Sequence, residues 1–511
     1  MASLLNLLPW LLGVILAVAG CSFLLFTLYV HYMHVKFSHI PGPKRSSFFF
    51  GHLPQFKKAI QEKRLPDDLC FDWYQEHGKV FVFFLLHRPH VHVYTPEAVR
   101  EILVQKNFPK EPYSYSRLSG LFGQKFMGRS LLTEIDNDTW RPLSDLFSPT
   151  FHRNFLKTCT AQFNKSCDLL LEEVGKMADG QTEIQMLDMF NRVSLDCICK
   201  VAFGLDLNVF TKDESRFIGD IKLVLDSIFQ SFINPLLWCN PLASAKAFRE
   251  QACSSAAYIR KIGRDCILAK LEALERGEPL EHNILSHILQ TSTGGSGLVN
   301  ETELEDMVNH FVTFFAAGQE TTACLMTSAL LELGRHPDIA YKMRTEVDAV
   351  IGEDGNCSFE DLSSLKYTTA VLKEALRVHP PVAAIMREST EDVVWNGIRI
   401  PKGCCVSVSI INMGRLEEYF ENPGEFMPSR FMGDESYSYV HVPFSLGPRK
   451  CMGGVFAMIE ARIIMAKLMK YFTFDLVPGQ SFRYVKRVTT KPKDGLLVYA
   501  KPLGTRPTAL A

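Results

Sequence analysis

The fold of this chain is decided by residues 444–453, FSLGPRKCMG, a loop that places glycines on both sides of Cys451 and a cation two residues before it. Glycine permits backbone conformations with positive φ and lets a flat ligand approach the chain closely. A nearby positive charge favours the thiolate form of cysteine, which is the form that ligates metals. A lone cysteine in an apolar segment is more often a small buried side chain. The fixed spacing of Phe444, Gly447, Arg449, Cys451 and Gly453 favours a metal ligand instead.

This spacing, F-x-x-G-x-R-x-C-x-G, resembles that of the cytochrome P-450 family, whose haem iron takes a cysteine thiolate as its axial ligand. The resemblance implies that Cys451 binds the iron of haem b through sulfur and that Arg449 pairs with a haem propionate. The helix that follows Gly453 would turn its positive end toward the sulfur. The expected fold is mainly α with minor β-sheet, the cytochrome P-450 fold, formed by residues 51–511 as one haem-thiolate monooxygenase domain.

A second motif lies within the helical segment 308–330, VNHFVTFFAAGQETTACLMTSAL. A glycine inside a helix destabilises the helix by roughly 1 kcal/mol relative to alanine, so the presence of Gly318 calls for an explanation. One explanation is a packing glycine, with Thr321 bonded to the carbonyl one turn earlier. The resemblance implies another, in which this helix is locally opened on the distal side of the haem. Thr321 would then serve oxygen activation, and Glu320 would help relay protons from solvent.

Glu374 and Arg377 stand three residues apart in the helical segment 365–378, just before a proline pair. Most such pairs are exposed and contribute little to stability. In the resembled family the pair is buried and joined by a second arginine, and Arg430 fits that position. These three residues are therefore expected to be scaffold rather than catalytic groups.

Two further propionate contacts are expected from the resemblance, Trp140 and Arg387. The family usually has Arg or Lys four residues after this tryptophan, whereas this chain has Ser144. Arg141 is the candidate replacement. Pro142 would disturb a continuing helix, so this helix is expected to begin late.

The remaining pattern predicts further elements. Residues 80–94, VFVFFLLHRPHVHVY, predict two strands in which Val91 and Val93 face inward. His90 and His92 would then face outward, which is a simpler interpretation than a metal site. Helical periodicity dominates 139–351 and 455–468.

The N-terminal segment predicts a membrane anchor. No Asp, Glu, Lys or Arg precedes Lys36, and residues 4–30 are almost wholly apolar, which is long enough to span a bilayer. A cleaved signal peptide is the alternative, because residues 17–19 are AVA, but no basic region precedes the apolar run. Cations follow the span, so the body should face the cytosol. We expect residues 1–35 to be a single-pass anchor in the endoplasmic reticulum membrane and residues 36–50 a proline-rich hinge.

Composition limits the partners. The 55 Lys and Arg nearly balance the 56 Asp and Glu, which argues against a nucleic-acid partner. The 14 cysteines are scattered, as in a chain whose thiols stay reduced. No dinucleotide or flavin motif is present. Electrons would therefore come from a separate NADPH-cytochrome P-450 reductase in the same membrane.

The sequence thus indicates a membrane-anchored monooxygenase that uses O₂ to hydroxylate a hydrophobic small molecule. A sterol is indicated because several stretches resemble sterol-hydroxylating members of the family. Fatty acids or xenobiotics are alternative substrates. A peroxide isomerase or dehydratase is disfavoured by the retained Glu320 and Thr321, and a haem-binding carrier or sensor without turnover stays open. The resemblance assigns substrate contacts to residues 113–127, Phe314, Ala317, 382–386, Thr489 and Thr490, and the sterol-like stretches are 39–54, 308–323, 396–403, 413–431 and 442–454.

Overall fold

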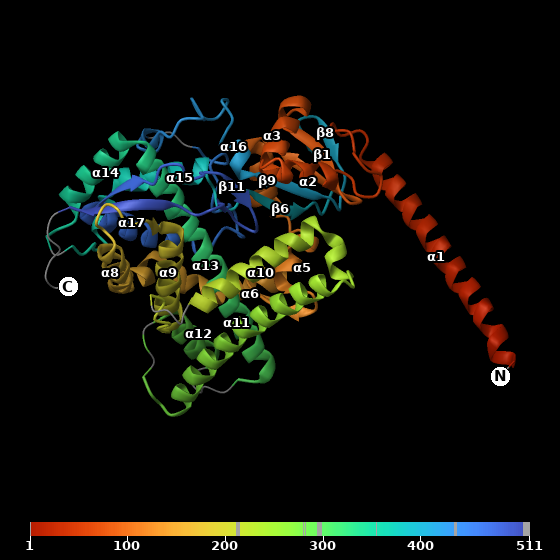
Figure 1. Cartoon of the computed structure of the whole chain (residues 1–511), viewed down its shortest axis with the longest axis horizontal. Helices are drawn as coiled ribbons and strands as arrows, with labels where there is room; N and C mark the ends of the chain where they lie inside the picture. Colours follow the sequence, from red (N-terminus) through yellow and green to blue (C-terminus); the bar gives the residue numbers. More distant parts are fainter. Residues whose placement is uncertain are drawn as a thin grey trace. The chain divides into compact units, whose positions relative to one another are not determined.

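The computed structural model describes residues 2–210, 215–279, 281, 283–293, 299–353, 355–433 and 437–503 (Figure 1). Internal contacts divide the chain into two units. The first contains residues 1–98 and 386–409, and the second contains 99–385 and 410–511. The predicted fold class, mainly helical with minor sheets, is confirmed.

The first unit joins a long N-terminal helix to a small sheet of order β1-β2-β9-β6. The predicted strand pair in 80–94 is confirmed as an antiparallel hairpin, and β2 continues the sheet in parallel with β9. The elements are α1 (Ala2–Lys36), α2 (Leu53–Gln61), α3 (Pro66–His77), β1 (Val80–Leu85), β2 (Arg88–Val93), β6 (Ala384–Glu388), β7 (Val393–Trp395), β8 (Ile398–Ile400) and β9 (Cys405–Ser409), with α4 (Pro96–Arg100) at the boundary.

The prediction that His90 and His92 face outward is wrong, because both side chains are buried. Trp73 of α3 packs on the same part of the hairpin, against the rings of Phe81 and Phe83. The His90 ring stacks on Phe83, with centroids 5.4 Å apart. The prediction from alternating apolar and polar residues was wrong because helices cover the face of the hairpin that this pattern assigned to solvent.

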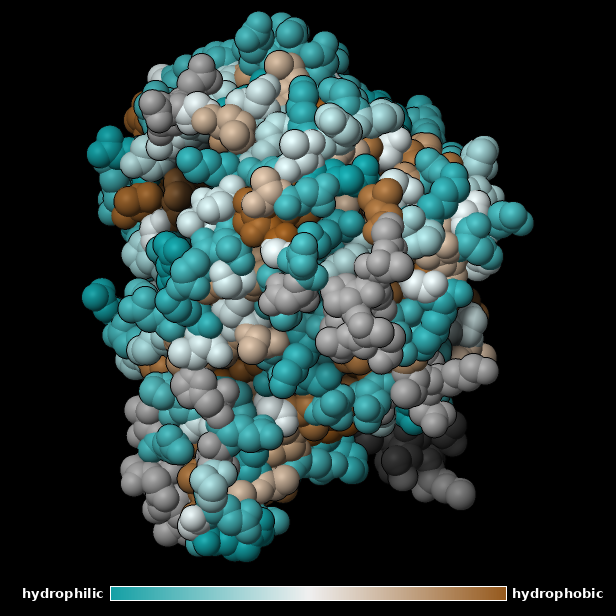
Figure 2. All heavy atoms as spheres, turned by 90° about the vertical axis from the view of Figure 1, so that its left-hand side faces the viewer, coloured by the Kyte–Doolittle hydropathy of each residue, from teal (hydrophilic) through white to brown (hydrophobic). Residues whose placement is uncertain are grey.

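Helix α1 carries the apolar surface expected of an anchor. Among the described residues, one helix is long and apolar enough to cross a membrane, over Pro9–Lys36. Its large apolar side chains are exposed along most of that length, from Trp10 to Val35. On the face of the molecule in Figure 2, by contrast, hydrophobic residues form small patches separated by hydrophilic ones.

The segment after α1 is held by specific contacts. Phe49 lies against Phe23 of α1, with ring centroids 5.6 Å apart. The carbonyl of Pro41 accepts a hydrogen bond of 2.8 Å from the Val82 amide. The residues after α1 therefore lie against both the helix and the sheet of this unit.

The second unit is built around α13, the longest of its helices, which begins at a capping box formed by Asn300 and Glu303. Helix α13 packs against α9, α11, α15 and α17. The helices are α5 (Pro112–Ser119), α6 (Asn137–Phe147), α7 (Arg153–Thr158), α8 (Thr160–Lys176), α9 (Met186–Ile198), α10 (Ser215–Ile233), α11 (Ala243–Glu275), α12 (Ile284–Thr293), α13 (Glu301–Arg335), α14 (Pro337–Val350), α15 (Lys366–Val378), α16 (Ile410–Met413) and α17 (Gly454–Tyr471). The strands are β3 (Gly120–Leu121), β4 (Gln124–Lys125), β5 (Ile184–Gln185), β10 (Phe472–Leu476), β11 (Tyr484–Lys486), β12 (Thr490–Pro492) and β13 (Leu497–Pro502).

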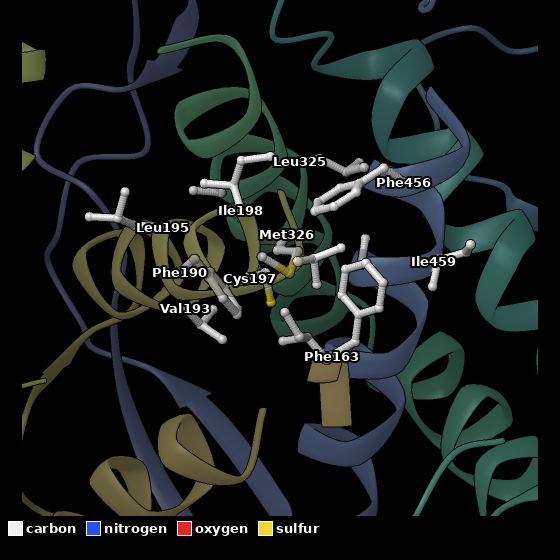
Figure 3. Packing of buried hydrophobic residues seen from close by; sticks show 14 of the residues in the cluster. Phe163, Phe190, Val193, Leu195, Cys197, Ile198, Leu325, Met326, Phe456 and Ile459 are labelled. Atoms are coloured by element: carbon white, nitrogen blue, oxygen red, sulfur yellow. The ribbon is translucent and has the colours of Figure 1, made fainter. Parts of the chain in front are cut away.

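The core of the second unit lies where α8, α9, α13 and α17 meet. Figure 3 shows Phe163 of α8 and Phe456 of α17 beside side chains of α9 and α13. The two rings meet edge to face, with centroids 4.9 Å apart. This packing fixes the start of α17, three residues after Cys451, relative to α13.

The predicted scaffold cluster is confirmed. Arg377 donates two hydrogen bonds of 2.7 and 2.8 Å to the carboxylate of Glu374, and Arg430 donates a third of 3.0 Å. All three side chains are almost fully buried. Arg377 also donates to the carbonyls of Gly414, Pro423 and Glu425, so the cluster ties α15 to the segment that leads toward the cysteine loop.

Candidate functional site

The loop before α17 has a backbone that requires glycine. Gly447 has a φ of +72°, and a Cβ there would lie 1.9 Å from the carbonyl oxygen of Leu103. The amide of Cys451 donates a hydrogen bond of 2.7 Å to the carbonyl of Phe444, which closes the loop. The spacing read from the sequence therefore corresponds to a tight turn that presents the Cys451 sulfur.

Two groups near Cys451 favour its thiolate form. Desolvation raises the pKa of the thiol above its usual value, and the Gly453 amide and the charge of Lys110 oppose part of that rise. Cys451 nevertheless keeps accessible surface. An accessible sulfur on which an N–H donor and a cation act fits the axial ligand of a haem.

Arg449 and Trp140 lie in direct contact. The Arg449 guanidinium is 4.3 Å from the centroid of the Trp140 ring. It donates hydrogen bonds of 2.8 to 3.0 Å to the carbonyls of Glu134, Ile135 and Asp136 and to Oδ1 of Asn137. The structure thus brings together two of the residues expected at the propionates. Their propionate role itself stays a prediction.

The expectation that the Trp140 helix begins late is wrong. Helix α6 begins at Asn137, where the side chain of Asp136 accepts a hydrogen bond from the Thr139 amide, and Pro142 lies inside the helix. Arg141 is exposed on α6. The structure therefore gives Arg141 no buried place beside Trp140 from which to replace the basic residue absent at Ser144.

Lys110 is a buried cation that sequence reasoning missed. Its side chain is nearly inaccessible, and its ammonium donates to the carbonyl of Leu132 and lies 4.8 Å from the Tyr115 ring. Its charge reaches the Cys451 thiol. A single lysine in a loop carries no motif, so only the fold reveals its proximity to the cysteine.

One face of α13 is accessible in an otherwise buried helix. Phe314, Ala317, Gly318 and Thr321 keep accessible surface, while their neighbours Phe315, Ala316, Gln319, Glu320 and Thr322 are buried. The spacing i, i+3, i+4, i+7 places the four on one side of the helix. This face is mostly apolar, with the Thr321 hydroxyl as its polar group.

The expected local opening of this helix is not seen, because α13 is continuous from Glu301 to Arg335. The Thr321 hydroxyl donates a hydrogen bond of 2.7 Å to the carbonyl of Ala317. The side chain thus bonds back one turn without interrupting the helix, as the simpler interpretation of the motif expected.

Glu320 is buried in an ion pair away from that face. Its carboxylate pairs with the ammonium of Lys491 on β12 and accepts a hydrogen bond of 2.6 Å from the Thr489 hydroxyl. Burial alone would lower the pKa of Lys491, but the Glu320 carboxylate raises it above its usual value. Thr489, expected at the substrate, therefore has its hydroxyl committed to Glu320.

Arg387 lies on β6 in the first unit and is almost fully buried. The other residues expected at the haem belong to the second unit. A propionate contact by Arg387 stays a prediction.

These features define a class of protein. A tight glycine loop presents an accessible cysteine, with a cation and an amide donor acting on its sulfur. A buried helix keeps one apolar, threonine-bearing face accessible. This is the arrangement of a haem-thiolate oxygenase.

The model of the cytochrome P450 family matches residues 41–499, so the chain belongs to that family. It is a cytochrome P450 monooxygenase, with haem iron as its cofactor and electrons supplied by a redox partner. Cytochrome P450 4d2 of Drosophila melanogaster is 27% identical over 485 residues, which are 91% of this chain and 94% of the relative. Cytochrome P450 3A29 of Sus scrofa is 27% identical over 493 residues, 94% of each chain. Cytokinin hydroxylase of Arabidopsis thaliana is 27% identical over 435 residues, 84% of this chain and 82% of the relative.

Proposed function

We propose that this chain is a membrane-anchored monooxygenase that hydroxylates a sterol, in the manner of a cholesterol 24-hydroxylase. The proposal of a hydrophobic substrate is supported by the accessible face of α13, where Phe314 and Ala317 lie beside Gly318 and Thr321. An apolar face with one hydroxyl suits a ligand bound with few polar anchors. The choice of a sterol rests on the five stretches of sequence that resemble sterol-hydroxylating members.

The residues of the chain divide the work at the haem. Cys451 would hold the iron through sulfur, and the charges of Lys110 and Arg449, with the ring N–H of Trp140, would attract the propionate carboxylates. When bound, the haem supplies an iron centre that activates oxygen. Thr321 presents a hydroxyl to the oxygen side of the pocket.

We assign the anchor to α1, in the endoplasmic reticulum membrane, with the catalytic domain in the cytosol. The span Pro9–Lys36 supports a single pass, and the cations at Lys36, Lys44 and Arg45 follow it, in agreement with the positive-inside rule. The electron donor in this proposal is an NADPH-cytochrome P-450 reductase of the same membrane.

Fatty acids or xenobiotics are the second candidate substrates. These substrates stay candidates because the relatives are not all sterol hydroxylases by name. Proteins about equally identical to this chain include a cytokinin hydroxylase and members whose names state no substrate. A carrier or sensor without turnover loses its support, since the family is one of monooxygenases.

The test is a binding screen followed by turnover. The full-length protein, loaded with haem, is titrated with sterols, fatty acids and terpenoids, and water displacement at the iron is followed by absorbance. Sterols should give the tightest spectral change and, with reductase and NADPH, a hydroxylated product. Tight spectral changes and products with fatty acids alone would replace the sterol by the second candidate.

A further inference from the structure

Glu320 and Lys491 form a buried ion pair between α13 and the β11–β12 hairpin. The exposed fractions of their side chains are 7% and 10%. The Thr489 hydroxyl donates to the second oxygen of the Glu320 carboxylate. Because both charges are taken out of water, each depends on the other for compensation. Lys491 therefore fixes both the charge and the position of Glu320.

The hairpin holds Lys491 rigidly. Strands β11 and β12 pair antiparallel with Lys486 opposite Thr490. The Thr490 amide donates a hydrogen bond of 2.8 Å to the carbonyl of Pro381, and the Arg487 amide donates one of 2.8 Å to the carbonyl of Thr489. The backbone on which Lys491 sits is thus tied down on both sides, and its ammonium is the part free to move.

A second carboxylate lies within electrostatic reach of the same ammonium. Asp226 of α10 is among the groups that raise the pKa of Lys491, after Glu320 and Cys324. One Asp226 oxygen, Oδ1, is buried and accepts no aligned hydrogen bond from the described residues. Arg487 Nε lies 3.2 Å from this oxygen, and both side chains are about a third accessible. Asp226 is thus a partly accessible carboxylate that is paired with Arg487 and whose charge acts on Lys491.

The other titratable group at the pair is the Cys324 thiol, one turn after Glu320 on α13. Burial, and then the Glu320 charge, raise its pKa far above the usual range, so it stays neutral. The carboxylates whose charges act on Lys491 are therefore Glu320 and Asp226. Arg487 is the cation beside Asp226.

Glu320 and Thr321 are not joined in this arrangement. The Thr321 hydroxyl donates to the Ala317 carbonyl, and Glu320 is bonded to Thr489 and Lys491. Both oxygens of the Glu320 carboxylate are thus engaged, one by Thr489 and one by Lys491. An oxygen becomes available to accept a proton only when one of these bonds loosens.

We propose that Lys491 is the positioning residue of Glu320, and that it exchanges Glu320 for Asp226 when Glu320 takes up a proton. The proton comes from solvent, adds to the Glu320 carboxylate, and leaves it again toward Thr321, while Lys491 remains an ammonium throughout. Helix α10, which carries Asp226, thereby influences proton delivery to α13. This inference rests on the monooxygenase function, but its first test does not.

The first test measures the protonation of Glu320 directly. The full-length, haem-loaded Lys491→Met variant is compared with Lys493→Met, which removes an exposed lysine two residues away on the same hairpin segment. Infrared difference spectra against the wild type at neutral pH should show an additional protonated carboxyl band in Lys491→Met that disappears when Glu320→Gln is added, since the subtraction removes the band of protonated Glu460. Lys493→Met should show no additional band. A spectrum of Lys491→Met without that band would overturn the assignment, whatever the activity of the protein.

The second test concerns turnover. With the sterol identified by the binding screen, Lys491→Met should form several-fold less product per NADPH consumed than Lys493→Met. If Lys491→Met does not fold, Asp226→Asn keeps the Glu320 pair intact and tests the exchange. Asp226→Asn should show no new carboxyl band, lower coupling of NADPH to product, and a shifted pH profile of product formation. A pH profile and coupling equal to the wild type would overturn the role of Asp226.

Discussion

The Arg449 guanidinium lies 4.3 Å from the centroid of the Trp140 ring and at the same time hydrogen-bonds four oxygens of residues 134–137. One side chain therefore joins the cysteine loop to the start of α6. Planarity and five N–H donors allow arginine to stack on a ring and bond in its own plane, which an ammonium cannot do.

Replacing Arg449 by lysine should destabilise the protein while conserving the charge. Arg449→Lys loses the stacked contact and most of the four hydrogen bonds, and leaves buried carbonyls without donors. We expect a loss on the order of 3 kcal/mol in the free energy of unfolding. We also expect faster transfer of haem to an acceptor protein. Denaturant titration and haem-transfer kinetics measure the two effects.

The control for this change is Arg141→Lys, which alters an exposed arginine on α6 beside Trp140. It should stay within about 0.5 kcal/mol of the wild type. Equal stability of Arg449→Lys and Arg141→Lys would show that the contacts of Arg449 do not hold the loop.

Glu460 of α17 is fully buried, and burial raises the pKa of its carboxyl to about 8, with Ser194 as the nearby donor that acts in the opposite direction. The folded protein therefore holds a proton on Glu460 between about pH 4.5 and pH 8, where the unfolded chain does not. Stability should fall as the pH rises through that window, by about 1.4 kcal/mol per pH unit from this group alone.

Glu460→Gln keeps the shape of the protonated side chain and removes its titration. The variant should lose this part of the pH dependence and be more stable than the wild type at the alkaline end of the window. Denaturant titrations of both proteins across the window give the comparison. Parallel pH profiles of wild type and variant would mean that Glu460 does not titrate there.

Cys451→Ala should abolish the thiolate-type spectrum of the reduced carbon monoxide complex, because Cys451 is the one thiol in the loop 444–453. Cys266→Ala, which removes a half-buried thiol on α11, should keep it. The measurement is a reduced carbon monoxide difference spectrum of each purified protein. Retention of the spectrum by Cys451→Ala would contradict the assignment of Cys451 as the iron ligand.

The sequence predicted those site residues that belong to short motifs of neighbouring residues. The loop around Cys451 is readable because its glycine spacing is dictated by one tight turn, and Gly447 admits no side chain. Glu374, Arg377 and Arg430 are readable because a buried ion cluster requires fixed partners, which the two short segments supply.

The residues that the sequence could not reveal come from distant segments. Lys110 and Lys491 are single lysines without a motif, and each acquires its role only when the fold buries it beside Cys451 or Glu320. His90 and His92 were misjudged for a related reason, since the helices that cover their strand lie elsewhere in the chain. Burial of a side chain depends on which elements pack on it, and periodicity within one strand does not contain that information.

Thr321 offers the sharpest test of the accessible face of α13. Thr321→Ala removes a hydroxyl bonded only to the carbonyl one turn earlier, so the free energy of unfolding should change by less than about 1 kcal/mol. NADPH consumption should continue, with hydrogen peroxide replacing much of the hydroxylated product. The matched control is Thr322→Ala, since Thr322 makes the same backward bond, to the carbonyl of Gly318, but is buried on another side of the helix. Peroxide formation in Thr321→Ala alone would assign the effect to the accessible hydroxyl, whereas equal uncoupling in both variants would assign it to the packing of α13.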